Sequence, residues 1–328
     1  MSQEKPEILI IGAGAVGLSI AGKLSETSEV LVVCRKRHAD AILKNGLSLK
    51  GVWGEKRISN LKCFISAEDL KKAELKFDFI FITSKSSDTS TICDQYSDFL
   101  KESITVSIQN GIGNEDILKK YSKKVIGATI TTNFHSDEYG SVTVQSESEP
   151  MKLGFYPDNS NAGINEITTL KKLTDLINKS GISAEISEDI RSSIWEKSLL
   201  NIAVNPVTAI FSIPVGKTLD VNLRAVISEL IKEAFCVMSV ENIKIRWKNS
   251  EDYLEYLFDY LIPSFSEVYT SMYQDIEIKR PTEIDFINGA VVKLGRKNNI
   301  KMPFNSCIYS LLKYREKTAL LSQRTPEP

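Results

Sequence analysis

The chain has 328 residues, of which 42% are hydrophobic and 25% are charged, and its formal net charge is −1 at pH 7. This length and composition fit two domains with substantial cores and argue against a disordered or fibrous protein. Because a net charge near zero provides no field to recruit nucleic acid or an anionic membrane, we expect neither partner and favour a small molecule.

The first segment, ILIIGAGAVGLSIAGKLS at residues 8–25, predicts a strand, a glycine turn and a helix. In the resulting G-x-G-x-x-G pattern, Gly12 permits a tight turn, Gly14 the approach of a pyrophosphate and Gly17 close helix packing. A turn without a ligand is the alternative, whereas the glycines and the marginal length argue against a membrane segment. The cofactor-binding residues predicted here are Gly12, Ala13, Gly14, Ala15, Val16 and Gly17.

The second strand lies in EVLVVCRKR, residues 29–37, and ends where this type of fold meets the adenine ribose. An NAD enzyme usually carries an acidic residue there, but this chain has Arg35, followed by Lys36 and Arg37. The basic end therefore favours NADP, with Arg35 as the candidate contact. A solvated run of surface charges is the alternative.

Two later strands end in polar residues. KFDFIFITSK ends at Lys85, and SITVSIQNGIGNEDILKKY places Asn110 at the carboxyl end of a strand, before a glycine-rich turn and a helix. Ligands of open α/β sheets bind outside these ends, so Lys85 and Asn110 are predicted to face the same crevice as the glycine turn. Each could instead be a polar residue that caps a loop.

The alternation of strands and helices continues to about residue 187, after which long helical patterns take over. We predict an α/β, Rossmann-type NADP-binding domain over 1–187 and an all-α substrate domain over 188–328, with a tail from about 318 that frays. Within the first domain, the remaining predictions are a short helix at 38–46, a hairpin at 46–59, closing strands within 123–132 and 141–157, a helix at 164–179 and a strand at 182–186.

A polar stripe marks the apolar helix predicted over 194–211. Lys197, Asn201 and Asn205 recur at every fourth position, and four residues advance about 400° around a helix, so their side chains stay within about 80° of one another. In the alternative interpretation Lys197 reaches solvent, and Asn205 satisfies backbone groups freed by Pro206.

A second group of candidates lies in SMYQDIEIKRPTEIDFING, which begins at Ser271. Pro281, Thr282 and Glu283 are predicted to open a helix. Glu283 could serve only as a charge at that helix start, and Ser271 as a surface hydroxyl. The apolar face predicted for this helix is Ile284, Ile287, Val291 and Leu294.

Together, five stretches resemble the ketopantoate reductases, also called 2-dehydropantoate 2-reductases: GAGAVG, Lys85 after FIFITS, QNGIG, WEKSLLNIAVNPVTAI and SMYQDIEIKRPTEIDFING. The match runs from the glycine turn to the region around Pro303. The resemblance implies NADPH-dependent reduction of ketopantoate to pantoate, for the synthesis of pantothenate and coenzyme A. It also implies a second domain similar to the C-terminal-like fold of 6-phosphogluconate dehydrogenase.

The resemblance further implies roles for individual residues. Lys197 would be the general acid, and Glu283 would be a catalytic acid close to the cofactor and the substrate hydroxyl. Substrate contacts are implied for Asn110, Asn201, Asn205 and Ser271. Cofactor contacts are implied for Lys85, Asn110 and Glu283.

The chemistry agrees with a lysine acid. Hydride addition to a ketone develops negative charge on oxygen, which requires a proton donor or cation at that atom. The two histidines, His38 and His135, lie in no acid–base motif, so we expect Lys197 to donate, with a pKa lowered by partial burial. The cysteines form no close pair and no metal-ligand spacing, so we expect no metal, no disulfide and a reducing cytoplasm. They are Cys34, Cys63, Cys93, Cys236 and Cys307.

Two alternative functions and the oligomeric state stay open. Val215 follows Pro214 where several family members carry asparagine, so the substrate could be another branched 2-oxo acid. A catalytically silent NADPH-binding sensor or scaffold is a different class of function, although such a protein would not need Lys197, Asn201, Ser271 and Glu283 together. A homodimer is possible.

Overall fold

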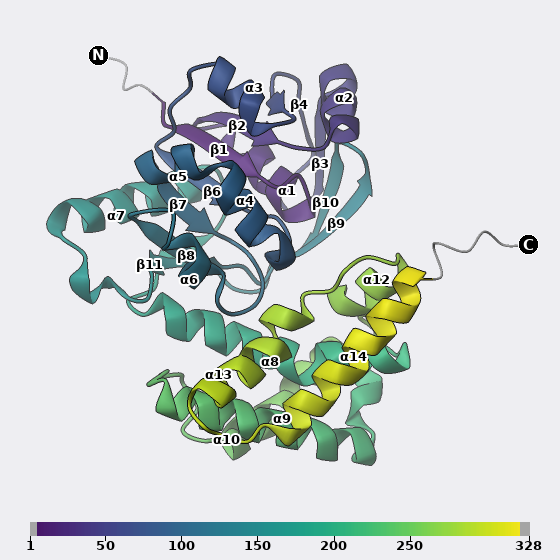
Figure 1. The fold of residues 1–328 in the computed structure, drawn as a ribbon. Coiled ribbons are helices and arrows are strands. Elements are labelled where there is room, and N and C mark those ends of the chain that lie inside the picture. The colour runs from purple at the N-terminus through teal and green to yellow at the C-terminus, as the bar shows by residue number, and fades with distance from the viewer. Residues whose placement is uncertain (1–4, 322–328) are drawn as a thin grey trace, which may run out of the picture. The chain divides into compact units, whose positions relative to one another are not determined.

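A computed structural model describes residues 5–321 and divides the chain into two compact units (Figure 1). Unit 1 comprises residues 5–109 and 114–193 of the described chain, and unit 2 comprises 110–113 and 194–321. The short stretch 110–113, within the QNGIG turn, therefore belongs to the second unit. Within the described residues, no helix is both long and apolar enough to cross a membrane.

The main sheet of unit 1 has the order β12-β11-β8-β7-β6-β1-β2-β5. Its central pairs are parallel, and β11 runs antiparallel to β8. The order reverses beside β1, which is the switch point of a dinucleotide-binding fold, and the expected α/β class is confirmed. The strands are β1 (Glu7–Ile11), β2 (Glu29–Val33), β5 (Lys62–Phe64), β6 (Phe79–Ile82), β7 (Ile104–Ser107), β8 (Val125–Thr129), β11 (Met151–Phe155) and β12 (Ala184–Ile186).

Both faces of this sheet are covered by apolar cores. Ile8 and Ile10 of β1 pack in the core that includes α1 and α7, whereas Leu9 and Ile11 pack in the core that includes α3 to α6. Alternate residues of a strand point to opposite faces, which explains why these strands read as continuous apolar runs. The helices are α1 (Ala15–Leu24), α2 (Lys36–Asn45), α3 (Ala67–Lys72), α4 (Thr89–Gln95), α5 (Ser97–Glu102), α6 (Asn114–Leu118) and α7 (Ile164–Lys179), with 3-10 turns η1 (Ser86–Asp88) and η2 (Asn159–Asn161).

A second, four-stranded sheet of unit 1 has the order β4-β3-β10-β9. The hairpin predicted over 46–59 is confirmed as the antiparallel pair of β3 (Leu47–Gly51) and β4 (Lys56–Ile58). The closing segment 141–157 splits between sheets: β10 (Ser141–Ser146) joins the small sheet and β11 joins the main one. β9 (Asn133–Glu138) was not predicted, because its strand character depends on pairing with β10.

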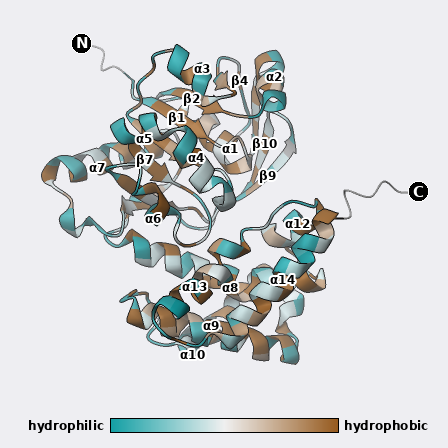
Figure 2. Cartoon of the chain, in the orientation of Figure 1, coloured by the Kyte–Doolittle hydropathy of each residue, from teal (hydrophilic) through white to brown (hydrophobic). Residues whose placement is uncertain are grey.

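Unit 2 is helical, and hydrophilic and hydrophobic residues are interspersed along its helices (Figure 2). The longest, α8 (Ile190–Phe211), starts in unit 1, enters unit 2 at Ile194 and continues through Pro206 without ending there. The other helices are α9 (Val221–Val240), α10 (Ser250–Tyr256), α11 (Ile262–Ser264), α12 (Ser271–Glu277), α13 (Asn288–Lys297) and α14 (Pro303–Leu321). Shorter turns are η3 (Val215–Leu219), η4 (Leu257–Leu261) and η5 (Ile284–Phe286).

The helix predicted to open at Pro281 was placed too early. Residues Ile284–Phe286 form only the short turn η5, and the α-helix begins at Asn288. The carbonyl of Phe286 accepts a hydrogen bond from the N–H of Ile112 at 2.7 Å, so this oxygen is bound to another segment at the point where a helix would otherwise start. The predicted apolar face is nevertheless directed inward: Ile284, Ile287 and Val291 are buried, and Leu294 is half-buried.

Candidate active site

Three of the predicted site residues meet within unit 2. The Lys197 ammonium donates a hydrogen bond to Asn110 Oδ1 at 2.8 Å, and Asn110 Nδ2 donates to Glu283 Oε2 at 3.4 Å. Lys197 and Asn110 are half-buried, and Glu283 is 6% exposed. The amide thus joins an ammonium to a buried carboxylate, with its oxygen toward the cation and its nitrogen toward the anion.

The glycine-rich turn after β7 brings Asn110 to this position. Gly111 has a φ of +89°, and a Cβ on it would lie 2.6 Å from the carbonyl oxygen of Phe286. Only glycine permits both this backbone conformation and this approach. The turn is therefore fixed against η5, the segment that follows Glu283, so Asn110 and Glu283 are held close together.

The polar stripe predicted on α8 is present. Asn201 is half-buried and Asn205 is buried, and within residues 5–321 neither side-chain amide forms a hydrogen bond. Around the stripe, Trp195, Leu199 and Ile202 are buried. On this apolar helix, the two amides are therefore polar groups whose hydrogen-bonding capacity is not used by any residue that the structure describes.

Asn205 does not satisfy the backbone group that Pro206 frees. Proline has no N–H, so the carbonyl four residues earlier, that of Ile202, loses its helical partner. The side-chain amide of Asn288 donates to this carbonyl at 3.1 Å. Asn288, and not Asn205, therefore satisfies the backbone carbonyl that Pro206 leaves without a partner.

Ser271 lies near the far end of the same stripe. It is the first residue of α12 and is exposed, and the preceding residue, Thr270, shares a 2.7 Å hydrogen bond with Thr208 of α8. Thr208 follows Lys197 by eleven positions, or about 16 Å along a helix, and lies on the same face. Sequence reasoning missed Thr208 and Thr270, although Thr208 continues the helical period of the stripe.

The glycine turn of unit 1 has the close contacts expected of a dinucleotide-binding loop. A Cβ on Gly12, whose φ is +119°, would lie 2.5 Å from the nitrogen of Ser84, and one on Gly17 would lie 1.9 Å from the Gly12 oxygen. At Gly14 a Cβ would meet nothing within 4 Å, and the first turn of α1 receives no side-chain cap. The turn between β1 and α1 therefore has open space beside Gly14 at the uncapped N-terminus of α1, as the approach of a pyrophosphate requires.

Polar atoms also gather where β6 and β7 end. Gln109 donates to the Ser84 carbonyl at 3.1 Å and to Thr89 Oγ1 at 2.8 Å. The Ser84 hydroxyl and Gln109 Oε1 are buried without a hydrogen-bond partner in the described chain. Lys85, the predicted cofactor contact, follows at the start of η1 and is half-buried. These unpaired polar atoms beside the switch point fit a ligand that supplies hydrogen bonds.

The three basic residues after β2 differ in their contacts. Lys36 forms an ion pair with Asp40 at 3.1 Å, and Arg37 donates to the Tyr139 hydroxyl at 2.7 Å and lies over its ring. Arg35 is exposed at the N-cap of α2, and its guanidinium has no protein partner in the part of the chain described. Of the three, Arg35 is the cation whose donors are available to a phosphate.

The arrangement supplies a proton donor and hydrogen-bonding amides. Among residues 5–321, no group of three His, Cys, Asp or Glu side chains is placed to hold a metal ion. Lys197 can deliver a proton, and Asn201 and Asn205 can bind oxygen atoms one and two helical turns away. Such a set suits reduction of a small oxygen-rich carbonyl compound.

Comparisons with known proteins agree with this geometry. Residues 8–158 match the family described as Ketopantoate reductase PanE/ApbA, and residues 189–316 match its C-terminal counterpart. A 2-dehydropantoate 2-reductase of Pyrococcus horikoshii is 31% identical over 313 residues, which cover 94% of this chain and 97% of that protein.

Solved structures extend the likeness to the fold. A ketopantoate reductase of the PanE/ApbA family from Ralstonia eutropha superposes with a TM-score of 0.83 at 24% identity, over 95% of this chain and 99% of that one. A D-mandelate dehydrogenase, solved with NADH and anilino(oxo)acetate, gives a TM-score of 0.82 at 26% identity and the same coverage. The family matches include the glycine turn in the first region and Lys197, Ser271 and Glu283 in the second, and the chain therefore belongs to the ketopantoate reductase family of NAD(P)-dependent oxidoreductases.

Proposed function

We propose that this enzyme reduces 2-dehydropantoate to pantoate with NADPH, a step of pantothenate and coenzyme A synthesis. The hydrogen-bonded series Lys197, Asn110 and Glu283 is the observation that carries the proposal. In this series the Lys197 ammonium, which we propose as the proton donor, lies beside an amide and a buried carboxylate. The chain's relatives named 2-dehydropantoate 2-reductase match over nearly their whole length.

The substrate is proposed to lie along the polar face of α8. The side-chain amides of Asn201 and Asn205 form no hydrogen bond to a described residue, and Ser271 has an exposed hydroxyl near the end of this face. These groups suit the carboxylate and hydroxyl oxygens of a 2-oxo acid, while the ammonium of Lys197 lies one helical turn before Asn201, at the proposed position of the 2-oxo group. Asn110 is proposed to contact both the substrate and the cofactor.

The proton is proposed to come from Lys197 Nζ. When bound, the reduced nicotinamide supplies the hydride, which adds to C2 of the substrate. As negative charge develops on the 2-oxo oxygen, Lys197 stabilises it and transfers one proton, which gives the 2-hydroxy acid. Asn110 Oδ1 orients the ammonium during this transfer, and Glu283 holds Asn110 and is proposed to accept a hydrogen bond from the substrate hydroxyl. Lys197 regains its proton from solvent, so one hydride and one proton are consumed per turnover.

NADP(H) is the proposed cofactor. The backbone N–H groups after Gly14 would hold the pyrophosphate, and Arg35, which has no partner within the described residues, would bind the 2′-phosphate. Lys85 and Asn110 are proposed as further cofactor contacts. The preference for NADPH over NADH rests on Arg35.

A second candidate is reduction of a different branched 2-oxo acid. One observation that favours this possibility is the similar fold of a D-mandelate dehydrogenase, a protein whose name indicates a different substrate. Val215 adds to it, since this apolar residue is 4% exposed and follows Pro214, where the family pattern often has asparagine.

The test is NADPH oxidation with 2-dehydropantoate, compared with a panel of branched and aromatic 2-oxo acids and repeated with NADH. The proposal expects the highest kcat/KM for 2-dehydropantoate. A higher value for another acid would select the second candidate, and NADPH binding without turnover of any acid would favour a silent sensor.

Three broader proposals accompany this function. Residues 1–187 are proposed as the cofactor domain and residues 188–328 as the substrate domain. The cysteines are not all far apart in the fold as expected, because Cys34 and Cys63 share a hydrogen bond. A cytoplasmic location is nevertheless supported by the cysteines of the described chain, which are free thiols. A homodimer is a proposal that sedimentation analysis can test directly.

A further inference from the structure

A buried carboxylate of the C-terminal helix holds the residue next to Glu283. Glu316 of α14 is 7% exposed, and its Oε2 accepts two hydrogen bonds from Thr282, one from the backbone N–H at 3.0 Å and one from the hydroxyl at 2.6 Å. Thr282 is itself 3% exposed. The pair is separated by 34 positions in sequence, so it anchors the segment of Glu283 to a distant helix.

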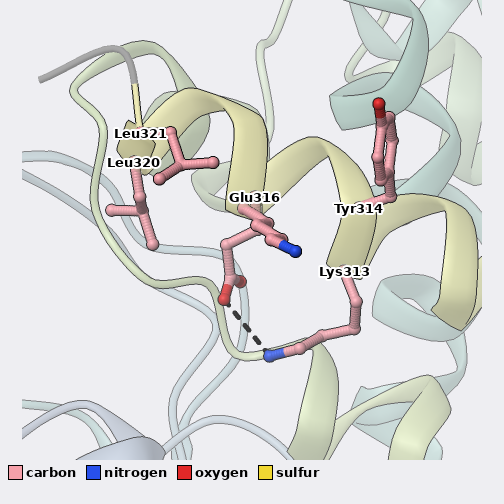
Figure 3. A pocket seen from close by; sticks show the side chains of 6 residues that line it. Lys313, Tyr314, Glu316, Leu320 and Leu321 are labelled. Atoms are coloured by element: carbon pink, nitrogen blue, oxygen red, sulfur yellow. Dashed lines mark hydrogen bonds and ion pairs between the residues drawn. The ribbon is translucent and has the colours of Figure 1, made fainter. Parts of the chain in front are cut away.

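The other side of Glu283 is held by the same helix. Lys313 of α14 donates to Asp285 at 3.1 Å and to Glu316 Oε1 at 3.2 Å, and Tyr309 donates to Asp285 at 2.6 Å. Figure 3 shows the ion pair between Lys313 and Glu316 along α14. Partial burial disfavours the charge of Lys313, but its hydrogen bond to Asp285 and the charge of Glu316 outweigh that effect and raise its pKa.

Glu283 therefore sits between two anchored neighbours. Its own side chain makes no capping hydrogen bond to η5 and accepts a hydrogen bond from Asn110 instead. From this geometry we propose that Glu316 and Thr282 are positioning residues, which act on the reaction by holding the Glu283 carboxylate against Asn110. The inference rests on the proposed function only for its kinetic consequence, because the geometry of Glu283 can be measured separately.

The carboxylate of Glu316 suits this task for a physical reason. A buried carboxylate must be hydrogen-bonded or paired, and one that accepts from both donors of a single residue fixes that residue in position and in orientation. Glu316 satisfies this condition through Thr282 and Lys313. A hydroxyl at position 282 is thus required, whereas its methyl group is not.

The test uses substitutions that preserve shape. Thr282→Val removes the hydroxyl that donates to Glu316, and Thr282→Ser retains it. The loss of this charge-assisted hydrogen bond is expected to lower kcat about tenfold, and the serine variant should recover most of the activity. Thr174→Val is the matched control, since Thr174 is a similarly buried residue of unit 1 whose hydroxyl donates to a backbone carbonyl.

A double-mutant cycle separates positioning from general destabilisation. If Thr282 acts through Glu283, the substitution Thr282→Val should cause no further loss in kcat when Glu283 is already glutamine. An equal loss in both backgrounds would overturn the inference, as would wild-type kcat in Thr282→Val. Glu316→Gln keeps one acceptor for Thr282, so its kcat should lie between those of the wild type and Thr282→Val.

Crystal structures of the wild type and Thr282→Val give a measurement independent of turnover. The distance between Glu283 Oε2 and Asn110 Nδ2 should exceed hydrogen-bonding range in the variant, and an unchanged distance would refute the positioning role. If the wild type turns over no 2-oxo acid, the proposed function fails, while this pair of structures still decides the inference.

Discussion

The side-chain amide of Asn288 donates a hydrogen bond to the backbone carbonyl of Ile202, 3.1 Å away on another helix. This carbonyl is the one that Pro206 leaves without a helical partner. Asn288 is fully buried and also donates to Asn305 at 3.0 Å. A residue 86 positions away thus allows α8 to continue through its proline and keep Lys197, Asn201 and Asn205 on one face.

Asn288→Leu should destabilise the fold. The substitution leaves the Ile202 carbonyl buried without a donor, and we expect the free energy of unfolding in urea to fall by about 1–3 kcal/mol. Pro206→Ala restores an N–H to the helix, so the cost of Asn288→Leu should be smaller in that background. If Asn288→Leu lowers the free energy of unfolding equally in both backgrounds, Asn288 does not stabilise the fold through the Ile202 carbonyl.

Lys197→Ala should abolish turnover and leave cofactor binding intact. Removal of a general acid lowers kcat by about 10²- to 10⁴-fold, whereas the glycine turn and Arg35 are unchanged. Stopped-flow NADPH oxidation measures the first quantity, and a fluorescence titration of NADPH measures the second. Lys293→Ala, at an exposed lysine of α13, serves as the control. Turnover at the wild-type rate in Lys197→Ala would rule out the assigned role.

Arg35→Asp should weaken NADPH binding much more than NADH binding. A guanidinium that meets a phosphate forms charge-assisted hydrogen bonds, and their loss should raise the Kd for NADPH by about 10- to 100-fold. Lys36→Asp is the comparison, because Lys36 is already paired with Asp40. Similar losses for both cofactors in Arg35→Asp would remove the argument for a 2′-phosphate contact.

Alanine substitutions at two glycines of the cofactor turn should have different effects, one on stability and the other on NADPH binding. Gly17→Ala places a methyl group 1.9 Å from the Gly12 oxygen, so the free energy of unfolding should fall by about 2 kcal/mol or more. At Gly14 an added Cβ meets nothing within 4 Å and φ is −77°, so Gly14→Ala should fold normally. Its Kd for NADPH should nevertheless rise, because the methyl group occupies the path of the pyrophosphate. Normal NADPH affinity in Gly14→Ala would place the cofactor elsewhere.

Much of the fold could be predicted from local sequence patterns. The glycine turn, the apolar strands around Ile8 and Ile80, and the hairpin at 46–59 were predictable because turn chemistry and side-chain alternation involve only neighbouring residues. The strand β9 and the division of 141–157 between two sheets were not, since β10 pairs with β3 over roughly ninety positions of sequence. The start of α13 was misplaced for a similar reason: the Phe286 carbonyl is bound by Ile112.

Which residues share a face could be predicted from sequence spacing alone. The spacing of Lys197, Asn201 and Asn205 follows from helix geometry, and the position of Arg35 follows from the end of a strand. Which groups form hydrogen bonds with one another depends instead on how distant segments pack. Lys197 and Asn110 are 87 positions apart, and Asn110 and Glu283 are 173 apart, so their hydrogen bonds depend on the approach of Gly111 to Phe286. Periodicity is a property of neighbours along the chain, whereas hydrogen bonds over such separations exist only once the segments have packed.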